Sequence, residues 1–585
     1  MISLAYIAVR KNREGKKYVY LVEGYRVGDK VKNRTLKSYG KLDTLEKEEP
    51  GILERLRREA REGVIGEKET TSLTVTFDLK SEIDYEDKNY GWKLLDDVYR
   101  FLEIKPILST IMEKNKMAFN LDDILRLLVF QRFLNPGSKL ATINSQSELF
   151  GGWDINQNSV YRSLTHLDDA KEAIQFNAHH AITKKIGRVA TLVFYDVTNY
   201  SFEIDLNDSE TVDEKTGEVI IGKRKKGMCK DNGKDPIIQM GLFMDSNGIP
   251  ISYKLFEGNK PDVSTYIDAI KQVKEQFGIE RVVVVADKAM NSGNNIIKTS
   301  NNGDGWLFSQ KHRGKKGVCK KLQEFILDPV GWEFNKEMSF GKKSMIRKRE
   351  LKTTTKPYET KEVTEKVLVT WNKKYADREK IRRDGALEYA SKLTNARVFY
   401  ETCKKGGKKY LELYTIDETN QEKKPFNPLI ELNKEAIEFD EQFDGVNVLV
   451  TSEIDMSDEE ILRSYKELAK IEDSFKVTKT DFETKPVYVY KPSHIEAHFL
   501  TCFLALLIMR IIQHKINNQM SPSRIIKALN SAKANPLEKG FYRVQANEDM
   551  KILNELIGIK WTDKFAKVEQ INHYGKGWCT TPKKQ

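Results

Sequence analysis

Apolar residues at the start of the chain follow the pattern of β-strands. Residues 3–9 and 17–27 alternate or run apolar, and a basic turn from Lys11 to Gly15 separates them. This arrangement predicts a β-hairpin. We therefore expect a basic N-terminal β unit with its linker over residues 1–80.

The next region has helical periodicity. From Trp92 to Ile186 apolar residues recur at helical spacing, with Asn120 as a candidate N-cap. The segment 158–164 presents Asn, Ser and Arg side chains as a recognition helix would. No helix-turn-helix glycine precedes it at the required distance, which favours an ordinary bundle helix. We expect residues 81–187 to form a helical, DNA-binding domain.

Short apolar runs and helical segments alternate after Ala190. Residues 190–198 predict a buried strand, residues 238–256 a β-hairpin, and residues 280–287 an apolar strand that runs into an aspartate. Helical patterns lie between these strands. The order β, β-hairpin, α, β, α, β indicates the first part of an α/β core over residues 188–310.

Residues 311–440 interrupt this alternation. They are basic, polar and partly β-like, which predicts a β-rich insertion. The pattern resumes with a strand at residues 445–451 and a long helix at 457–478. We assign residues 441–520 to the second part of the core, and residues 521–585 to a basic C-terminal tail.

Positive charge is in excess and is clustered. The chain has 98 Lys and Arg against 86 Asp and Glu, which gives a net charge of +12. A single basic run is typical of a solvated surface, but several runs interleaved with aromatic residues are typical of a protein that binds nucleic acid. The clusters lie at Arg10–Lys17, Lys223–Lys230, Lys311–Lys321, Lys342–Lys356 and Lys373–Arg383.

The sequence predicts neither membrane insertion nor export. The longest apolar run, Phe499–Met509, is shorter than the roughly 20 residues of a membrane-spanning helix and indicates a buried helix. The first residues lack the basic segment and cleavage site of a secretory signal. The five cysteines are far apart and form no Cys-x-x-Cys, which argues against a disulfide framework or a zinc ribbon. We expect a cytoplasmic protein.

Two aspartates stand where open α/β sheets bind ligands. Asp196 lies in the first core strand, and Asp287 follows the next strand of parallel type. Two carboxylates that meet suit Mg²⁺ or Mn²⁺, and a pair of such ions activates water and stabilises the leaving oxygen in phosphodiester chemistry. The alternative is that each aspartate only caps the following segment.

A third carboxylate lies on the helix predicted at 457–478. Tyr465 and Glu472 share one face of a continuous helix, and Lys476 and Lys479 continue that face. The carboxylate can complete a metal site, and the lysines can hold DNA phosphates beside it. The alternative is a routine i,i+4 ion pair between Glu472 and Lys476.

The carboxylates stand in short motifs with a regular spacing. Asp196 lies in Phe-Tyr-Asp-Val-Thr, Asp287 ends Val-Val-Ala-Asp, and the third motif reads Tyr465-x2-Leu468-x3-Glu472-x6-Lys479. The chain resembles the DDE transposases of bacterial insertion sequences, one subgroup of which has the signature Tyr-x2-Arg-x3-Glu-x6-Lys. Leu468 replaces the signature arginine, so that phosphate contact is lost or comes from a neighbour such as Lys476. The likeness covers most of the chain and extends to Phe256-Glu257-Gly258-Asn259, Phe443-Asp444-Gly445 and Lys485-Pro486-Val487-Tyr488.

The resemblance implies a fold and a reaction. The expected fold is an α/β RNase H-like catalytic core interrupted by a β-rich insertion. Asp196, Asp287 and Glu472 would ligate two Mg²⁺ ions, with Tyr465 and Lys479 in contact with DNA near the cleavage site. The enzyme would recognise terminal inverted repeats, hydrolyse the phosphodiester at each element end and join the 3′-OH to target DNA. Such transposases usually act on double-stranded DNA as homodimers.

Other functions share some of these features. A different RNase H-like nuclease or recombinase would keep the carboxylates, and a silent DNA-binding descendant would not need them. Gly217-x4-Gly222-Lys223 imitates a phosphate-binding loop, but Arg224 stands where Ser or Thr must reach Mg²⁺, so we expect no nucleotide. His494 and His498 lack a third ligand for zinc.

Overall fold

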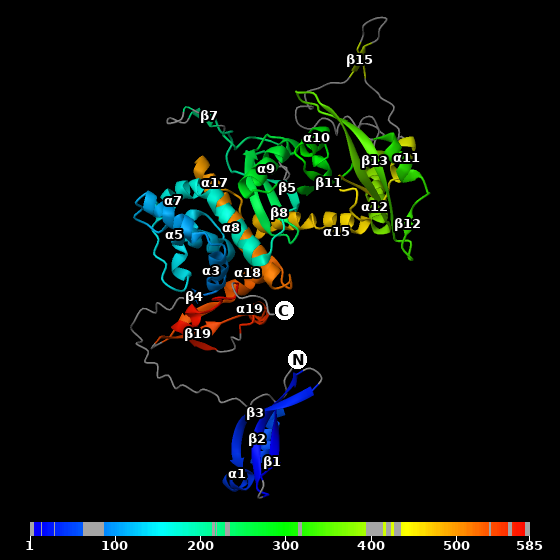
Figure 1. Cartoon of the computed structure of the whole chain (residues 1–585). Coiled ribbons are helices and arrows are strands. Elements are labelled where there is room, and N and C mark those ends of the chain that lie inside the picture. The colour runs from blue at the N-terminus through cyan, green and yellow to red at the C-terminus, as the bar shows by residue number, and fades with distance from the viewer. Residues whose placement is uncertain are drawn as a thin grey trace. The chain divides into compact units, whose positions relative to one another are not determined.

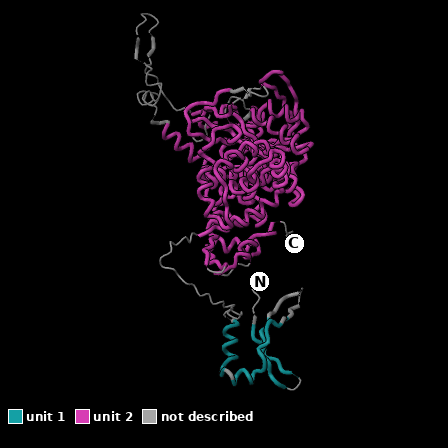
Figure 2. Tube along the Cα trace, turned by 90° about the vertical axis from the view of Figure 1, so that its left-hand side faces the viewer, with its two compact units in different colours: residues 1–81 teal, residues 82–585 magenta. Residues whose placement is uncertain are grey.

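The computed structural model divides the chain into two compact units, Met1–Ser81 and Glu82–Gln585 (Figure 2). Parts of the predicted linker, and of the basic runs at 223–230 and 311–321, lie outside the described residues. The structure describes residues 5–579 except 13–14, 28–29, 62–86, 213–216, 218, 221, 228–233, 314–318, 393–413, 417–422, 426–433, 538–539 and 560–563.

The first unit is a three-stranded antiparallel sheet covered by helices. The predicted hairpin is present, with a third strand beside its second one. Ile7 and Val19 of the sheet pack with Ile52 and Leu56 of the last helix, which closes a small apolar core. The elements are β1 (Ala5–Lys11), β2 (Lys17–Val27), β3 (Lys30–Lys41), α1 (Leu42–Glu48) and α2 (Ile52–Arg61).

The second unit begins with a bundle of helices (Figure 1). Asn120 caps α5 as predicted, because its side chain accepts hydrogen bonds from two backbone N–H groups of the first turn. The segment 158–164 lies in α7, whose Val160 and Leu164 are buried, and α7 packs against α17. The helices are α3 (Trp92–Phe101), α4 (Lys105–Lys114), α5 (Leu121–Leu134), α6 (Lys139–Asn144), α7 (Gln157–Asp169) and α8 (Lys171–Ile186).

A nine-stranded mixed sheet forms the centre of this unit, in the order β12-β13-β14-β17-β11-β10-β5-β8-β9. β5, β8 and β9 form an antiparallel meander, and β10 and β11 run parallel to β5. This is the mixed-sheet arrangement expected for an RNase H-like core. The strands of this part are β5 (Leu192–Ser201), β8 (Ile237–Asp245), β9 (Pro250–Glu257), β10 (Val283–Ala286), β11 (Gly305–Ser309) and β17 (Val446–Thr451), with the short pair β6 (Thr211–Val212) and β7 (Val219–Ile220) between β5 and β8.

Helices cover both faces of the sheet. On one face, Val193 and Val284 share an apolar core with α9 (Asp262–Phe277) and α10 (Gly293–Asn301). On the other face, Phe194 and Val285 share a larger core with α17 (Pro492–Lys515). By length and composition α17 could cross a membrane, but 94% of its apolar window is buried inside the unit, as predicted for Phe499–Met509.

The long strands of the predicted insertion belong to the core sheet. β14 (Thr360–Asn372) pairs with β17, and β13 (Phe340–Lys352) pairs with β14, so both strands extend the core sheet. The sequence pattern could not show this pairing because it joins residues far apart in the chain. The other described elements here are α11 (Lys320–Leu327), β12 (Glu333–Phe334), α12 (Lys373–Lys392), β15 (Tyr414–Ile416), β16 (Lys423–Pro425) and α14 (Lys434–Glu441).

The helix predicted at 457–478 is broken. α15 (Asp458–Lys466) ends before a turn at Glu467 and Leu468, α16 (Ala469–Lys476) follows, and a π-helical turn covers Val477–Asp481. Leu468 is only 8% exposed and packs into the core. The assumption of one continuous helix from Tyr465 to Lys479 was therefore wrong.

The assignment of residues 521–585 to a tail was also wrong. Ile525, Leu529, Met550 and Ile571 are fully buried in the larger core. The apolar runs that contain these residues are too short to give a periodic signal. The residues become buried where they pack with the helices of residues 92–186. The elements are α18 (Pro522–Ser531), β18 (Lys533–Pro536), β19 (Phe541–Gln545), α19 (Glu548–Leu556), β20 (Phe565–Lys567) and α20 (Val568–Asn572), with β4 (Lys88–Asn89) completing a four-stranded sheet.

Candidate catalytic site

Asp196 and Asp287 lie on neighbouring parallel strands. β5 and β10 pair with a constant offset that sets Phe194 opposite Val285. Continued along the strands, the same offset places Asp196 opposite Asp287. Asp196 is half-buried and Asp287 is exposed, so both can be reached from solvent at the carboxyl edge of the sheet.

Both aspartates lie on the same face of the sheet. Side chains alternate along a strand, so Asp196 shares the face of Phe194, and Asp287, whose backbone is extended, shares that of Val285. Phe194 and Val285 belong to the core that includes Phe475 of α16. The strand register and the alternation together direct the two carboxylates towards α15 and α16.

Glu472 comes to this edge from the first turn of α16. The helix packs against β5 through the buried Ile471 and Phe475, while Glu472 itself is exposed. A carboxylate in the first turn is stabilised by the helix dipole. Glu472 forms no ion pair with any described residue, so the alternative pair with Lys476 is not made.

Tyr465 of α15 lies where the three carboxylates converge. Burial raises the pKa of its phenol to about 12, and the negative charges of Asp287, Glu472 and Asp196 add to the rise. A hydrogen bond with Ser309, at the end of β11, opposes it. Because one hydroxyl is influenced by all three charges, the structure brings the three predicted carboxylates and the predicted tyrosine together.

The two predicted lysines differ in their surroundings. Lys476 is exposed at the end of α16. Lys479 is half-buried, with its ammonium 5.7 Å from the ring centre of Tyr200 on β5. Leu468 is in the core and contributes nothing to the polar surface. Both predicted lysines therefore follow Glu472 in the chain.

The three carboxylates suit a divalent cation in their donor atoms. Their oxygens are hard ligands of the kind that Mg²⁺ and Mn²⁺ take. Within the described part of the chain Asp287 forms no ion pair either. No three Asp, Glu, His or Cys side chains among the described residues are close enough together to hold a metal ion. The three carboxylates therefore offer oxygen ligands, but in this structure they do not surround a common point.

Comparison with known proteins assigns the family. The transposase DDE domain family matches residues 206–508, more than half of the chain. The chain belongs to the DDE transposases. Enzymes of this family work with divalent metal ions. The family of IS1634 transposase N-terminal domains matches residues 7–69, which is consistent with a transposase of an insertion sequence. Asp287 and Glu472 lie inside the DDE match, and Asp196 lies just before it.

Solved structures add only distant likenesses. A piggyBac transposase synaptic complex with hairpin DNA is 9% identical, with a TM-score of 0.32, and the match covers 79% of this chain and 82% of that one. The Mos1 strand transfer complex is 11% identical, with a TM-score of 0.14, and the match covers 45% and 67%. At TM-scores below 0.5, neither defines the fold or the function of this chain. No curated protein matches it significantly.

An arginine pair beside the carboxylates was missed from the sequence. Arg347 and Arg349 of β13 both bind Glu365 of β14, whose side chain is fully buried, at 2.5 and 3.0 Å. Both guanidinium groups also donate to Gln310, the residue after β11. The Arg-x-Arg spacing on a strand was the available signal. The transposase thus sets two fixed cations at the carboxyl edge of its core sheet.

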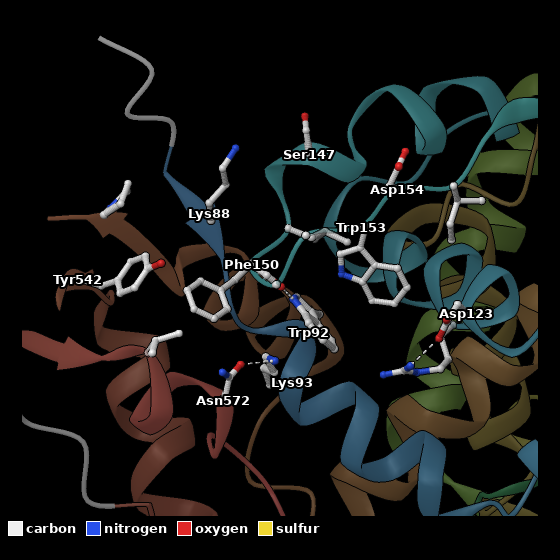
Figure 3. A pocket seen from close by; sticks show the side chains of 17 residues that line it. Lys88, Trp92, Lys93, Asp123, Ser147, Phe150, Trp153, Asp154, Tyr542 and Asn572 are labelled. Carbon is white, nitrogen blue, oxygen red and sulfur yellow. Dashed lines mark hydrogen bonds and ion pairs between the residues drawn. The ribbon is translucent and has the colours of Figure 1, made fainter. Parts of the chain in front are cut away.

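A large cavity lies elsewhere in the transposase. It encloses about 980 Å³ where α3 meets the C-terminal elements, and none of the three carboxylates lines it (Figure 3). Trp92 and Trp153 pack edge to face on one side, as do Phe150 and Tyr542 on the other. Lys93 holds its ammonium 4.3 Å from the Trp92 ring centre and donates to Asn572.

The competing motifs have structural roles. Lys223 pairs with Glu496 of α17, which also binds Lys171. His498 is buried and lies 3.1 Å from the carbonyl oxygen of Thr484, while His494 lies against Tyr161. The two histidines therefore pack against protein groups.

Proposed function

We propose that the protein binds the terminal inverted repeats of its own insertion sequence, cleaves DNA at the element ends and joins the 3′-OH to target DNA. The observation that carries this proposal is the convergence of Asp196, Asp287 and Glu472 around Tyr465 in a DDE transposase chain. A silent DNA-binding descendant would not require such convergence. A general nuclease would share it, so end specificity has to be tested directly.

Cleavage and joining are the same substitution at phosphorus. Water attacks in the first step and the 3′-OH in the second. Asp196, Asp287 and Glu472 would hold two Mg²⁺ or Mn²⁺ ions, which when bound lower the pKa of the attacking hydroxyl group and stabilise the leaving oxygen. Tyr465 keeps its proton at neutral pH because its pKa is near 12, and its hydroxyl can donate to a phosphate oxygen of the bound strand.

Cationic side chains on both sides of the carboxylates would hold the DNA backbone. Lys476 and Lys479 follow Glu472, and Arg347 and Arg349 lie across the sheet edge. Guanidinium groups fixed by a buried carboxylate are preorganised for phosphate. We propose double-stranded DNA as substrate, a homodimer that pairs two ends, and action in the bacterial cytoplasm on nucleoid DNA.

The test is a cleavage assay on DNA from the flanks of the gene itself. Purified protein is incubated with labelled flank DNA in Mg²⁺ or in Ca²⁺, beside the variants Glu472→Gln and Asp473→Asn. Asp473 is the matched control, because it is the next carboxylate on α16 and binds Arg510 instead. We expect Mg²⁺-dependent cuts at a repeat boundary that only Glu472→Gln abolishes.

Two outcomes would overturn the proposal. Cuts without preference for the element ends would indicate a general nuclease. Binding without cuts in Mg²⁺ and in Mn²⁺ would indicate a silent descendant.

A further inference from the structure

A short extended segment between the π-helical turn and α17 presents aromatic rings to solvent. Along this segment Val487 and Val489 are 3% and 5% exposed, whereas Tyr488 and Tyr490 are 53% and 56% exposed. The alternation arises because an extended chain directs successive side chains to opposite sides. The valines anchor the segment in the core, so the two tyrosines are held outward on a fixed support.

One ring of this pair is already oriented by a cation. The guanidinium of Arg224 lies 5.5 Å from the ring centre of Tyr490 and 5.5 Å from that of Phe202. Arg224 is itself fixed by Asp208, at 2.6 Å. The pair with Asp208 and the two rings hold Arg224 in place, and Tyr490 still leaves more than half of its surface free for a ligand.

The tyrosines are connected to the catalytic edge. Phe202 directly follows β5, the strand of Asp196. Tyr200, near the end of the same strand, faces the Lys479 ammonium and hydrogen-bonds Thr478 at 2.8 Å. The end of β5 therefore links Lys479, through Tyr200, with Arg224 and Tyr490, through Phe202.

The surroundings carry positive charge. Lys485 and Lys491 flank the tyrosines in the sequence, and Lys491 is exposed, with its ammonium 3.3 Å from the Thr165 hydroxyl. Lys226, two residues after Arg224, is exposed as well. Exposed aromatic faces within a cationic surface match single-stranded nucleic acid, whose bases stack and whose phosphates need countercharge. Paired bases cannot offer their faces, so duplex DNA gains little from the rings.

We propose that Tyr488 and Tyr490 form a stacking platform for unpaired bases of the DNA strand next to the cleavage site. The idea rests on the proposed function for the identity of the DNA. It adds that the enzyme recognises strand separation at the element end, and that a base displaced from the duplex rests on Tyr490 beside Arg224.

The test compares two DNAs of identical sequence, one fully paired and one with a short unpaired stretch. Dissociation constants are measured by fluorescence anisotropy without divalent metal, so that no cleavage intervenes. The variants are Tyr488→Leu/Tyr490→Leu, Tyr488→Phe/Tyr490→Phe and Tyr389→Leu. Tyr389, on α12, is the matched control because it too is 56% exposed and lies outside the basic clusters. Thermal melting verifies that each variant is folded.

We expect the double leucine variant to lose about tenfold or more in affinity for the unpaired DNA, and less than about twofold for the paired DNA. The phenylalanine variant should retain wild-type affinity, since the ring face is kept. Equal losses on both DNAs, or an equal loss in Tyr389→Leu, would overturn the platform. If the tyrosine variants bind as expected but the wild-type protein does not cleave DNA, the proposed function is overturned and the stacking platform is not.

Discussion

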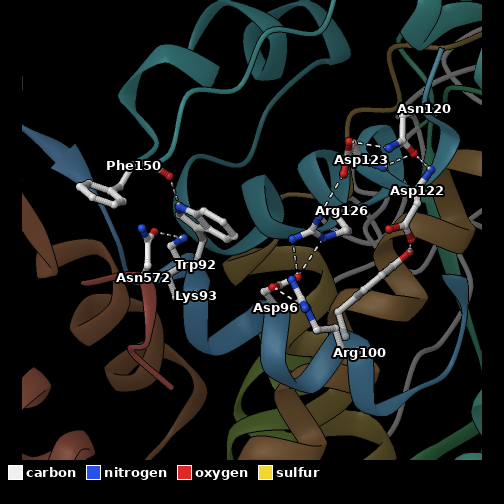
Figure 4. A network of polar contacts seen from close by, with 11 residues as sticks. Trp92, Lys93, Asp96, Arg100, Asn120, Asp122, Asp123, Arg126, Phe150 and Asn572 are labelled. Carbon is white, nitrogen blue, oxygen red and sulfur yellow. Dashed lines mark hydrogen bonds and ion pairs between the residues drawn. The ribbon is translucent and has the colours of Figure 1, made fainter. Parts of the chain in front are cut away.

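The sheet edge that carries the three carboxylates and the surroundings of the large cavity differ in how their charged side chains are paired. Beside the cavity, Asp96 binds Arg100 and Arg126, and Arg126 also binds Asp123, so each charge has a partner in the chain (Figure 4). At the edge, Glu472 is exposed and forms no ion pair with a described residue. Beside the cavity, the positive and negative side chains neutralise each other. At the edge, no described residue neutralises the charge of Glu472.

This contrast separates structural charges from functional ones. A partly buried ion network is tolerated when its members satisfy each other, and removing one member leaves an uncompensated charge. Carboxylates held close together raise the energy of a site, which is useful only if a ligand supplies countercharge. Burial raises the pKa of Tyr465, and the charges of Asp287, Glu472 and Asp196 raise it further.

The strongest test of the contrast is Asp287→Asn. The substitution keeps the shape and removes one charge, so we expect cleavage to fall at least about 10²-fold. The free energy of unfolding should change by less than about 0.5 kcal/mol, because the residue is exposed and, among the described residues, accepts a hydrogen bond only from the Ala289 backbone. A cleavage assay and a urea titration measure the two quantities. A large loss of DNA affinity would contradict the proposal that the carboxylates act in cleavage while the cationic side chains bind the DNA.

The reverse result is expected for Asp96→Asn. Asp96 is 10% exposed and Arg126 is 15% exposed, so the substitution leaves Arg126 insufficiently neutralised and should cost about 3 kcal/mol of stability. Cleavage by the folded protein should be unchanged. Arg100→Gln is the control, because Arg100 is 67% exposed and its ion pair is worth at most about 1 kcal/mol. Similar urea midpoints for Asp96→Asn and Arg100→Gln would show that the buried ion pair contributes no more to stability than the exposed one.

The contrast also shows which features the sequence could predict. Asp196 and Asp287 were predictable as neighbours, because apolar runs mark parallel strands and their carboxyl ends share one edge. The position of Tyr465 depends on a turn at Leu468, which a periodic pattern treats as one more helical residue. Arg347 reaches the edge only because β14 pairs with β17 across a long stretch of chain.

A smaller effect is expected for Tyr465→Phe, which removes the hydroxyl and keeps the ring. Loss of one hydrogen bond to a charged phosphate should slow cleavage about tenfold. The folded phenol has a pKa near 12 against an ordinary value of 10.0, so it stabilises the fold below pH 10 and this contribution is lost between pH 10 and 12. Urea titrations across that range should therefore fall more steeply for the wild type than for Tyr465→Phe. Parallel curves would show that the hydroxyl is not shielded by burial and the three carboxylates.

The smallest effect concerns the lysines after Glu472. Each lysine that neutralises a phosphate releases counterions, so Lys476→Gln and Lys479→Gln should each reduce the slope of log affinity against log salt by about one. Affinity should weaken equally for all DNA sequences, because phosphate contacts carry no base information. Lys271→Gln on α9 is the control, since that helix packs on the opposite face of the sheet. An unchanged slope in the two variants would place the DNA backbone away from α16, and the arginine pair of β13 would then have to supply the countercharge at this edge.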